Sequence, residues 1–327
     1  MSSRRVSTLL IGSCWACCLL SAVALAAPPA TKTADKEPAS KTKADKAKAD
    51  TAKADKTQFV RLKKDDKSKP SSLDVAITTY VGRNIAGDQV QVDLVGAIHI
   101  ADKDFFHRLN KEFEKYDVVL YELVAPKGVK PERGSAGLYS PIARMLELAD
   151  QIAEVDYTKK NFVHADMSGA EMAESMQKRD ESWLKMIGEA IGQGIAQASD
   201  PESGASDGQL LANLLTSRSP ALAWKRTMAP QFSDMEHSMG WLDGPDGSTI
   251  LTERNKVALK VLAEQLKTGK RRLAIFYGAG HFPDMERRLV GEFKLKRGEQ
   301  AWVTAWNLSD SRGGTPKATP SAKKSGK

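Results

Sequence analysis

The sequence predicts an α/β fold in which helices flank a mostly parallel central sheet. Between residues 58 and 308, short segments rich in valine, isoleucine and leucine alternate with longer segments of helical periodicity. Two of the apolar segments end in the same Gly-x-x-His pattern. Residues 168–240 have a helical pattern without a strand, so we expect a helical insertion there.

The first 26 residues have the three parts of a secretory signal. Arg4 and Arg5 precede an apolar run over residues 6–25, and the small-residue pattern at residues 24–26 is typical of a cleavage site. We therefore expect a periplasmic or secreted protein without a membrane span once the signal is removed. An uncleaved anchor helix is the alternative, because the apolar run is long enough to cross a bilayer.

All three cysteines lie inside this signal, at positions 14, 17 and 18. The cleaved chain would contain no thiol, so we expect neither a disulfide nor a thiolate–metal site. Its chemistry must then come from histidine, carboxylate, hydroxyl or basic side chains.

Residues 27–57 and 309–327 are predicted to be disordered. The first segment repeats Lys-Ala-Asp and has no aromatic or large aliphatic residue, so it cannot bury enough apolar surface to offset its chain entropy. The second is a basic tail rich in lysine, serine, proline and glycine. These segments and the signal carry the basic excess of a chain whose net charge is +8, which leaves residues 58–308 nearly neutral. The high isoelectric point is therefore no sign of a nucleic-acid partner, and none is expected.

The first part of the folded segment is predicted to form a hairpin, a helix and a buried strand. Residues 73–81 and 90–98 are rich in β-branched side chains and are separated by a Gly-Asp turn. A helix begins at Asp102, and its apolar face consists of Phe105, Phe106, Leu109 and Phe113. Residues 118–121 form a short apolar run that is typical of a buried strand.

The remaining elements alternate in the same way. A helix over about residues 142–152 and a short strand at 162–163 precede the insertion. After it, Ser248 begins a helix that ends near Lys267. Residues 273–277 are a second strongly apolar strand, followed by a helix from Pro283 and a last strand over 301–306.

The candidate site lies at the ends of two apolar strands. Gly96 and His99 follow the first of these strands, and Gly278 and His281 follow the second. Ligands bind at the carboxyl ends of parallel strands, where glycine permits a tight turn and the close approach of a bound group. Histidine is the commonest metal ligand, so two histidines from one sheet could share one ion. Taken alone, each histidine could instead be a hydrogen-bonded structural residue.

Glu122, Arg254 and Asn255 complete this candidate site. Glu122 directly follows the strand at 118–121 and should lie at the same edge of the sheet. Arg254 and Asn255 fall inside the apolar stripe of the helix that begins at Ser248, so we expect both to be buried. A buried arginine requires a partner, either a structural carboxylate or a substrate group.

Four further residues rank lower. His164 and Asp166 follow the short strand at 162–163 and could make contacts around the site. His107, in the middle of a predicted helix, and His237, in the insertion, are predicted to be structural.

The set Gly96-x-x-His99, Glu122, Arg254-Asn255 and Gly278-x-x-His281 resembles the TraB/GumN/TIKI family. That family belongs to a superfamily that includes the erythromycin esterases and the ChaN-like haem-binding proteins. The resemblance covers about residues 73–307 and implies an α/β core with a cleft between two related halves. For the TIKI branch it implies a metal-dependent protease that favours Mn²⁺ or Co²⁺.

The resemblance also implies roles for individual residues. His99, His281 and Glu122 would be metal ligands, with Glu122 as an alternative general base. Arg254 would stabilise the oxyanion, and Asn255 would hold the substrate or orient a ligand. The long methionine-rich middle segment and the Lys-Ala-Asp spacer depart from the family, so the resemblance implies no particular substrate.

We therefore expect an exported metal-dependent hydrolase that acts on a peptide or protein and uses Mn²⁺, Co²⁺ or Zn²⁺. One alternative keeps hydrolysis without a metal, as in an esterase whose histidine is the general base. The other is a non-catalytic envelope protein that binds haem, iron or a signal peptide.

Overall fold

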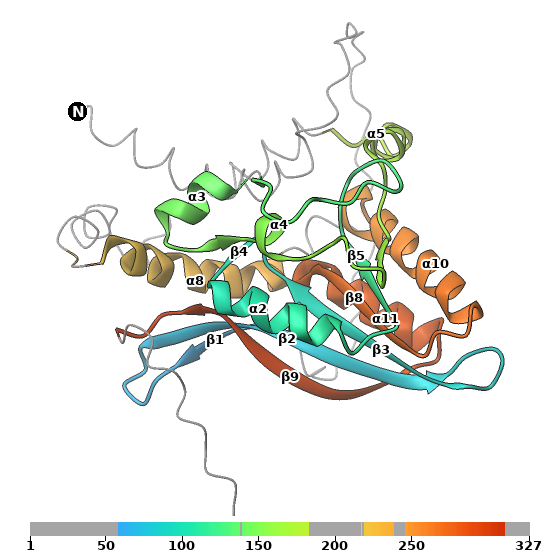
Figure 1. Cartoon of the computed structure of the whole chain (residues 1–327), viewed down its shortest axis with the longest axis horizontal. Coiled ribbons are helices and arrows are strands. Elements are labelled where there is room, and N and C mark those ends of the chain that lie inside the picture. The colour runs from blue at the N-terminus through green and yellow to red at the C-terminus, as the bar shows by residue number, and fades with distance from the viewer. Residues whose placement is uncertain (1–57, 138, 183–216, 218, 239–245, 311–327) are drawn as a thin grey trace, which may run out of the picture.

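The computed structural model describes residues 58–137, 139–182, 217, 219–238 and 246–310. The predicted signal, the Lys-Ala-Asp spacer, most of the basic tail and the middle of the insertion lie outside these ranges. The described residues form helices on both faces of one large sheet, which confirms the predicted α/β class (Figure 1).

The central sheet has seven strands in the order β1-β2-β3-β8-β5-β7, with β9 paired to β2. The strands are β1 (Val60–Lys64), β2 (Pro70–Arg83), β3 (Gln89–Ala97), β5 (Val118–Tyr121), β7 (Phe162–His164), β8 (Arg272–Gly278) and β9 (Lys296–Asn307). Only β2 runs against the others, because β1, β3 and β9 all pair with it antiparallel while β3, β8, β5 and β7 pair parallel. The mostly parallel sheet is thus confirmed, with β2 as the exception.

The long β2 strand is paired along both of its edges. It forms the predicted hairpin with β3 and pairs along its length with β9. The strand β1, which the sequence did not predict, continues the sheet along the same edge of β2 that β3 occupies further on. Consecutive residues in the middle of β2 and β3 are buried, so side chains from both faces of these strands contribute to the main core.

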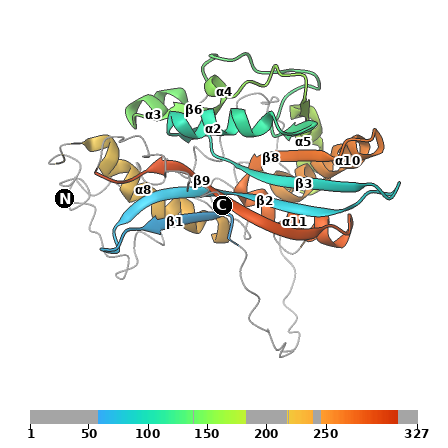
Figure 2. The same ribbon diagram turned by 60° about the horizontal axis from the view of Figure 1, so that its bottom comes forward.

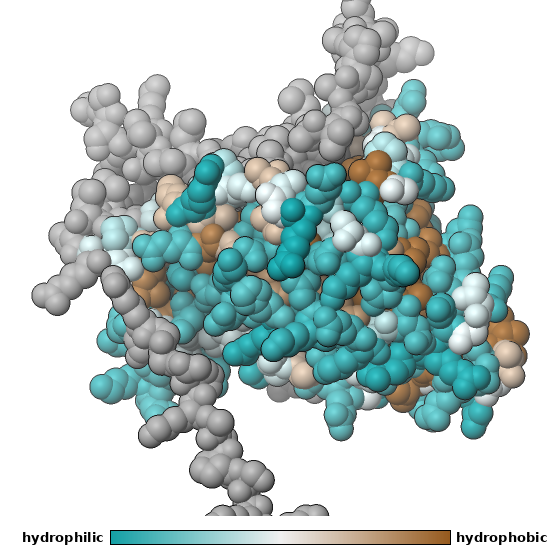
Figure 3. Space-filling model, in the orientation of Figure 1, coloured by the Kyte–Doolittle hydropathy of each residue, from teal (hydrophilic) through white to brown (hydrophobic). Residues whose placement is uncertain are grey.

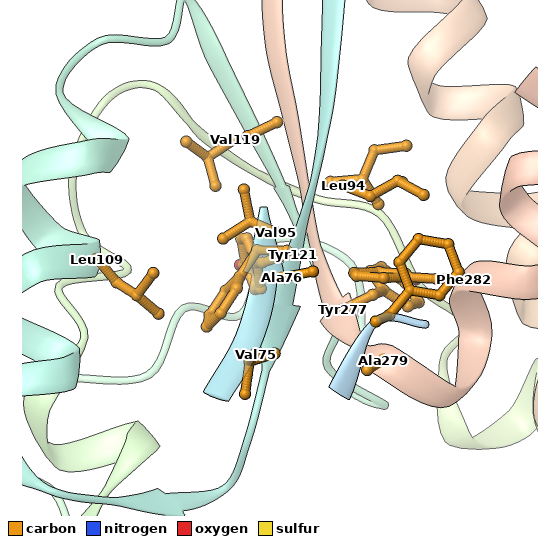
Figure 4. Packing of buried hydrophobic residues seen from close by; sticks show 14 of the residues in the cluster. Val75, Ala76, Leu94, Val95, Leu109, Val119, Tyr121, Tyr277, Ala279 and Phe282 are labelled. Atoms are coloured by element: carbon orange, nitrogen blue, oxygen red, sulfur yellow. The ribbon is translucent and has the colours of Figure 1, made fainter. Parts of the chain in front are cut away.

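Helices cover the parallel strands on both faces. The helix α2 (Lys103–Phe113) packs on one face, and its buried residues are those predicted: Phe105, Phe106, Leu109 and Phe113. The helices α10 (Arg254–Lys267) and α11 (Phe282–Gly291) cover the other face (Figure 2). In the close view, Leu109 and Val119 lie on one side of the strands, and Leu94, Tyr277 and Phe282 lie on the other (Figure 4). The outward surface over α2 is largely hydrophilic (Figure 3).

The predicted single helix over residues 142–152 is wrong. The chain instead forms α3 (Ser140–Met145), β6 (Ala149–Asp150) and α4 (Gln151–Glu154), with β6 paired antiparallel to β4 (Ile100–Ala101). Glu147 has a φ of 53°, a left-handed conformation that ends α3. The side chain of Asp150 then accepts the backbone N–H of Ile152 and caps α4.

The helix predicted from Ser248 begins with a distinct first turn. Ser248 accepts the backbone N–H of Leu251, as an N-cap should, but residues Thr249–Glu253 form a π-helical turn, η1, before α10. The described parts of the insertion are helical, as α5 (Gly169–Lys178) and α8 (Pro220–Ser238). Among the described helices, none is both long enough and apolar enough to span a membrane.

Candidate functional site

Three neighbouring parallel strands deliver the predicted site residues to one edge of the sheet. His99 follows β3, Glu122 follows β5, and His281 follows β8, the strand between the other two. Ala97 pairs with Gly278, and Tyr121 pairs with Phe276, so the three strands end at nearly the same level. Parallel pairing therefore gathers residues that are far apart in the sequence, as predicted.

Glu122 is hydrogen-bonded at both carboxylate oxygens. Its Oε2 accepts the backbone N–H of Gly278 at 2.8 Å, and its Oε1 accepts Nη2–H of Arg254 at 2.6 Å. Burial by itself raises the pKa of Glu122, but the positive charge of Arg254 and the neighbouring histidines outweigh it and lower that pKa to about 2. Glu122 is therefore a carboxylate throughout the physiological pH range.

Arg254 lies buried between two carboxylates. Its Nε and Nη2 donate to the two oxygens of Asp166 at 2.9 and 2.7 Å, a bidentate pair, and Nη2 also donates to Glu122. The predicted burial of Arg254 and Asn255 is confirmed, since their exposed fractions are 5% and 0%. Of the two kinds of partner that the sequence left open, the structure supplies carboxylates.

His281 is held by the side-chain amide of Asn255. Its Nδ1 lies 2.7 Å from Oδ1 of Asn255, whose Nδ2 donates to the carbonyl of His281 at 3.2 Å and to Asp284 at 2.9 Å. Because the amide nitrogen already donates to two acceptors, Oδ1 must accept, and Nδ1 of His281 carries the proton. The other ring nitrogen, Nε2, is then unprotonated in the neutral ring and has a free lone pair.

This Nε2 faces Oε1 of Glu122 at a distance of 3.6 Å. Burial lowers the pKa of His281 to about 4, although the charge of Glu122 opposes that shift, so the ring is neutral at pH 7. Two acceptor atoms therefore face each other. Such a pair is suited to a cation or to the protons of a water molecule.

The His281–Glu122 pair fits part of the donor set of a divalent metal. An imidazole nitrogen and a carboxylate oxygen that bind one ion at about 2.0–2.2 Å lie about 3–3.5 Å apart, close to the observed separation. Within the described ranges, no three histidine or acidic side chains are close enough to form a metal-binding group, so His99 is not joined to this pair. Arg254 also donates to the same Oε1, which places a positive charge next to the position of an ion.

His99 has its own set of contacts at the neighbouring strand end. Its ring stacks on Tyr139 with a centroid distance of 4.9 Å, and its carbonyl accepts the backbone N–H of Gln151 at 2.9 Å. Burial lowers the pKa of His99, while the charges of Glu122 and Asp150 act in the opposite direction. The charge of Glu122 thus reaches both histidines.

The two glycines have different surroundings. A Cβ atom on Gly96 would lie 2.0 Å from Cγ1 of Val75, so the absence of a side chain there allows β2 and β3 to pack. A Cβ atom on Gly278 would lie 3.5 Å from Oε2 of Glu122 and 3.8 Å from Cδ2 of His281, in ordinary contact with the site. Of the two, only Gly278 therefore borders the charged cluster, through its backbone N–H.

Among the residues ranked lower, Asp166 belongs to the cluster through Arg254, whereas Nε2 of His164 contacts the carbonyl of Leu123 at 2.5 Å. His107 is exposed on α2, and the side chain of His237 lies outside the described part of the chain. Sequence reasoning did not single out Asp284, which follows His281 by three residues in the first turn of α11. That spacing places both side chains on one helix face and could have indicated the contact through Asn255.

Comparison with known proteins assigns no family. No protein-family model matches the chain, and no curated protein or solved structure matches it either. Evidence for a function therefore comes from the geometry of the strand-end cluster, which consists of Glu122, Asp166, Arg254, Asn255 and His281.

Proposed function

We propose that this chain is an exported metal-dependent hydrolase of the TraB/GumN/TIKI kind, acting on peptide or other amide bonds at the strand-end cluster. The observation that carries the proposal is the His281–Glu122 pair, in which a neutral ring nitrogen and a carboxylate oxygen face each other at 3.6 Å. A buried arginine and a buried amide hold both members in place. Such a fixed arrangement of groups is typical of sites that activate water.

The residues of the cluster have distinct roles in this proposal. Glu122 is the carboxylate that accepts a proton from water, and Arg254 keeps it ionised and supplies positive charge close to a developing oxyanion. Asn255 fixes the ring of His281 so that Nε2 stays unprotonated. A divalent ion (Mn²⁺, Co²⁺ or Zn²⁺) would be held by His281 and Glu122, with His99 as the proposed third ligand, and would supply Lewis acidity toward water and a substrate carbonyl.

A metal-independent hydrolase is the second candidate, and one contact favours it. Arg254 donates at 2.6 Å to the same Glu122 oxygen that faces His281, so a cationic group already neutralises that oxygen. In this case Nε2 of His281 acts as the general base on water, oriented by Asn255 in the way that the third member of a catalytic triad orients its histidine.

Metal reconstitution separates the two candidates. The full chain is stripped with a chelator and titrated with Mn²⁺, Co²⁺ and Zn²⁺ while cleavage of a mixed peptide library is followed. We expect cleavage to return with about one metal per chain and to be lost in His99→Ala and His281→Ala, while His107→Ala, which alters an exposed residue of α2, retains it. Cleavage that persists in chelator would support the metal-independent candidate. Absence of cleavage under all conditions would refute both, and haem binding, detected by a visible absorption band, would then become the next test.

A further inference from the structure

Gln151 lies beside His99 in a position that the proposed roles do not use. The short strands β4 and β6 pair Ile100 with Asp150, which places His99 opposite Gln151 in the next position of the ladder. The backbone N–H of Gln151 donates to the carbonyl of His99 at 2.9 Å, as this register requires. Side chains of directly opposed residues lie on the same face of an antiparallel pair and contact each other.

The side-chain amide of Gln151 is buried and oriented. Gln151 is 5% exposed, and its Nε2 donates to the hydroxyl of Tyr157 at 2.8 Å. Because Nε2 points toward Tyr157, Oε1 on the opposite side of the amide points away from Tyr157. Among the described residues, Oε1 of Gln151 is one of three buried side-chain nitrogen or oxygen atoms without a hydrogen-bond partner. A buried acceptor that lacks a donor is costly, so a donor within reach of small side-chain movements is expected to use it.

The ring of His99 is the neighbouring group that can supply this donor. It lies opposite Gln151 and is stacked on Tyr139 at an interplanar angle of 13°. The nearby side chain of Gln151 also acts to raise the pKa of His99 against the effect of burial, as an acceptor for the ring N–H would. The same arrangement is complete at His281, where the buried amide of Asn255 lies 2.7 Å from Nδ1.

We propose that Gln151 is a positioning residue for His99, whose ring N–H donates to Oε1 of Gln151. The other ring nitrogen of His99 is then held unprotonated for the strand-end site. Both Gly-x-x-His histidines would thus be fixed in one tautomer by a buried amide, His281 by Asn255 and His99 by Gln151. The catalytic meaning of this contact rests on the proposed hydrolase function, but the contact itself does not.

Nitrogen-15 spectra of the histidine rings test this contact directly. The chain contains five histidines, so the ring signals of the full-length protein can be assigned with single His→Ala variants. In the wild type we expect one protonated and one unprotonated ring nitrogen for His99, with a persistent N–H signal. Gln151→Met removes the acceptor at nearly constant volume. The two tautomers of His99 should then interconvert, and the persistent N–H signal should be lost. Gln151→Glu, which retains an acceptor oxygen, should preserve it.

The signals of His281 provide the internal control for folding. They should be unchanged in both variants, because Asn255 and not Gln151 holds that ring. If Gln151→Met does not fold, Tyr157→Phe tests the same claim, since it releases the amide by removing one hydroxyl and should broaden the His99 N–H signal. Unchanged His99 signals in a folded Gln151→Met or Tyr157→Phe variant would overturn the proposal.

Activity measurements separate this inference from the proposed function. If the chain is a hydrolase, Gln151→Met should lower kcat by about 10- to 100-fold and Gln151→Glu should restore part of the rate, as expected for a residue that orients a site histidine. If the wild type shows no hydrolysis but the tautomer of His99 still depends on Gln151, the proposed function fails and the positioning role stands.

Discussion

Replacement of Arg254 by methionine is predicted to be strongly destabilising. The substitution keeps most of the side-chain volume and removes the only cation among the described residues that contacts both Glu122 and Asp166. The side chain of Asp166 is fully buried and that of Glu122 is 17% exposed, so neither carboxylate can recover full hydration. The variant therefore leaves two buried acceptor groups facing each other.

The size of the effect follows from these contacts. Three charge-assisted hydrogen bonds of 2.6, 2.7 and 2.9 Å are lost, and the loss of one partner from a buried ion pair costs about 3–5 kcal/mol of unfolding free energy. Glu122 also loses the cation that holds its pKa near 2. Its stabilisation, present above its ordinary pKa of 4.5 and lost as the pH falls toward 2, amounts to about 3 kcal/mol and should largely disappear.

Urea denaturation at pH 7 measures this loss, with Arg271→Met as the matched control. Within the described part of the chain, Arg271 makes one ion pair, with Asp88; its side chain is 60% exposed, and its removal should cost less than about 1 kcal/mol. The double variant Arg254→Met/Asp166→Leu should recover part of the stability, because one stranded carboxylate is then absent. Equal destabilisation by Arg254→Met and Arg271→Met would refute the buried-cluster reasoning.

Three other perturbations test separate parts of the site. With chelator present, His281 should lower the unfolding free energy by about 3 kcal/mol as the pH drops from 6.5 to about 4, because its ring binds a proton in the unfolded chain that the folded protein excludes. Urea titrations at the two pH values should show that His281→Gln removes this decrease. Gly96→Ala should destabilise the protein by about 1–3 kcal/mol because the added methyl group clashes with Val75, whereas Gly278→Ala should be nearly neutral. Val75→Ala should rescue Gly96→Ala and have no such effect on Gly278→Ala. Thermal melts in which Gly278→Ala is the less stable of the two glycine variants would contradict this assignment of the close contact. Asn255→Leu should lower kcat by about 10- to 100-fold because His281 loses its tautomer-fixing partner, and an unchanged pH–rate profile in that variant would disprove the role.

The sequence predicted most elements because their periodicity is strong. The buried face of α2 and the apolar strands β5 and β8 appear where the spacing of Phe105, Leu109 and the 273–277 run placed them. The predicted helix over 142–152 does not form because residues 149–150 pair with β4, and this long-range pairing overrides the local helical preference. The strand β1 was missed because Val60–Lys64 is short and mostly charged, and it is stabilised by pairing with β2.

The candidate site was predictable to the extent that strand order could be inferred. Parallel strands predict that their terminal residues meet, and Glu122, His281, Arg254 and Asn255 do form one cluster. The sequence could not show that Arg254 is paired bidentately with Asp166, since these residues lie 88 positions apart. Nor could it show that His99 faces Gln151, because that contact depends on the unpredicted β4–β6 pair.

The proposed function requires that the His281–Glu122 pair activates water for hydrolysis. Peptide-library cleavage by the metal-reconstituted full chain tests this requirement when it is compared with cleavage by Glu122→Gln, which retains the size and shape of the side chain but removes its charge. We expect the wild type and the exposed-residue control His107→Ala to cleave at the same rate, and Glu122→Gln to be slower by about 100-fold or more. Equal cleavage by Glu122→Gln and the wild type would contradict the claim, as would a folded wild-type chain that cleaves no peptide with any of the three metals or without metal.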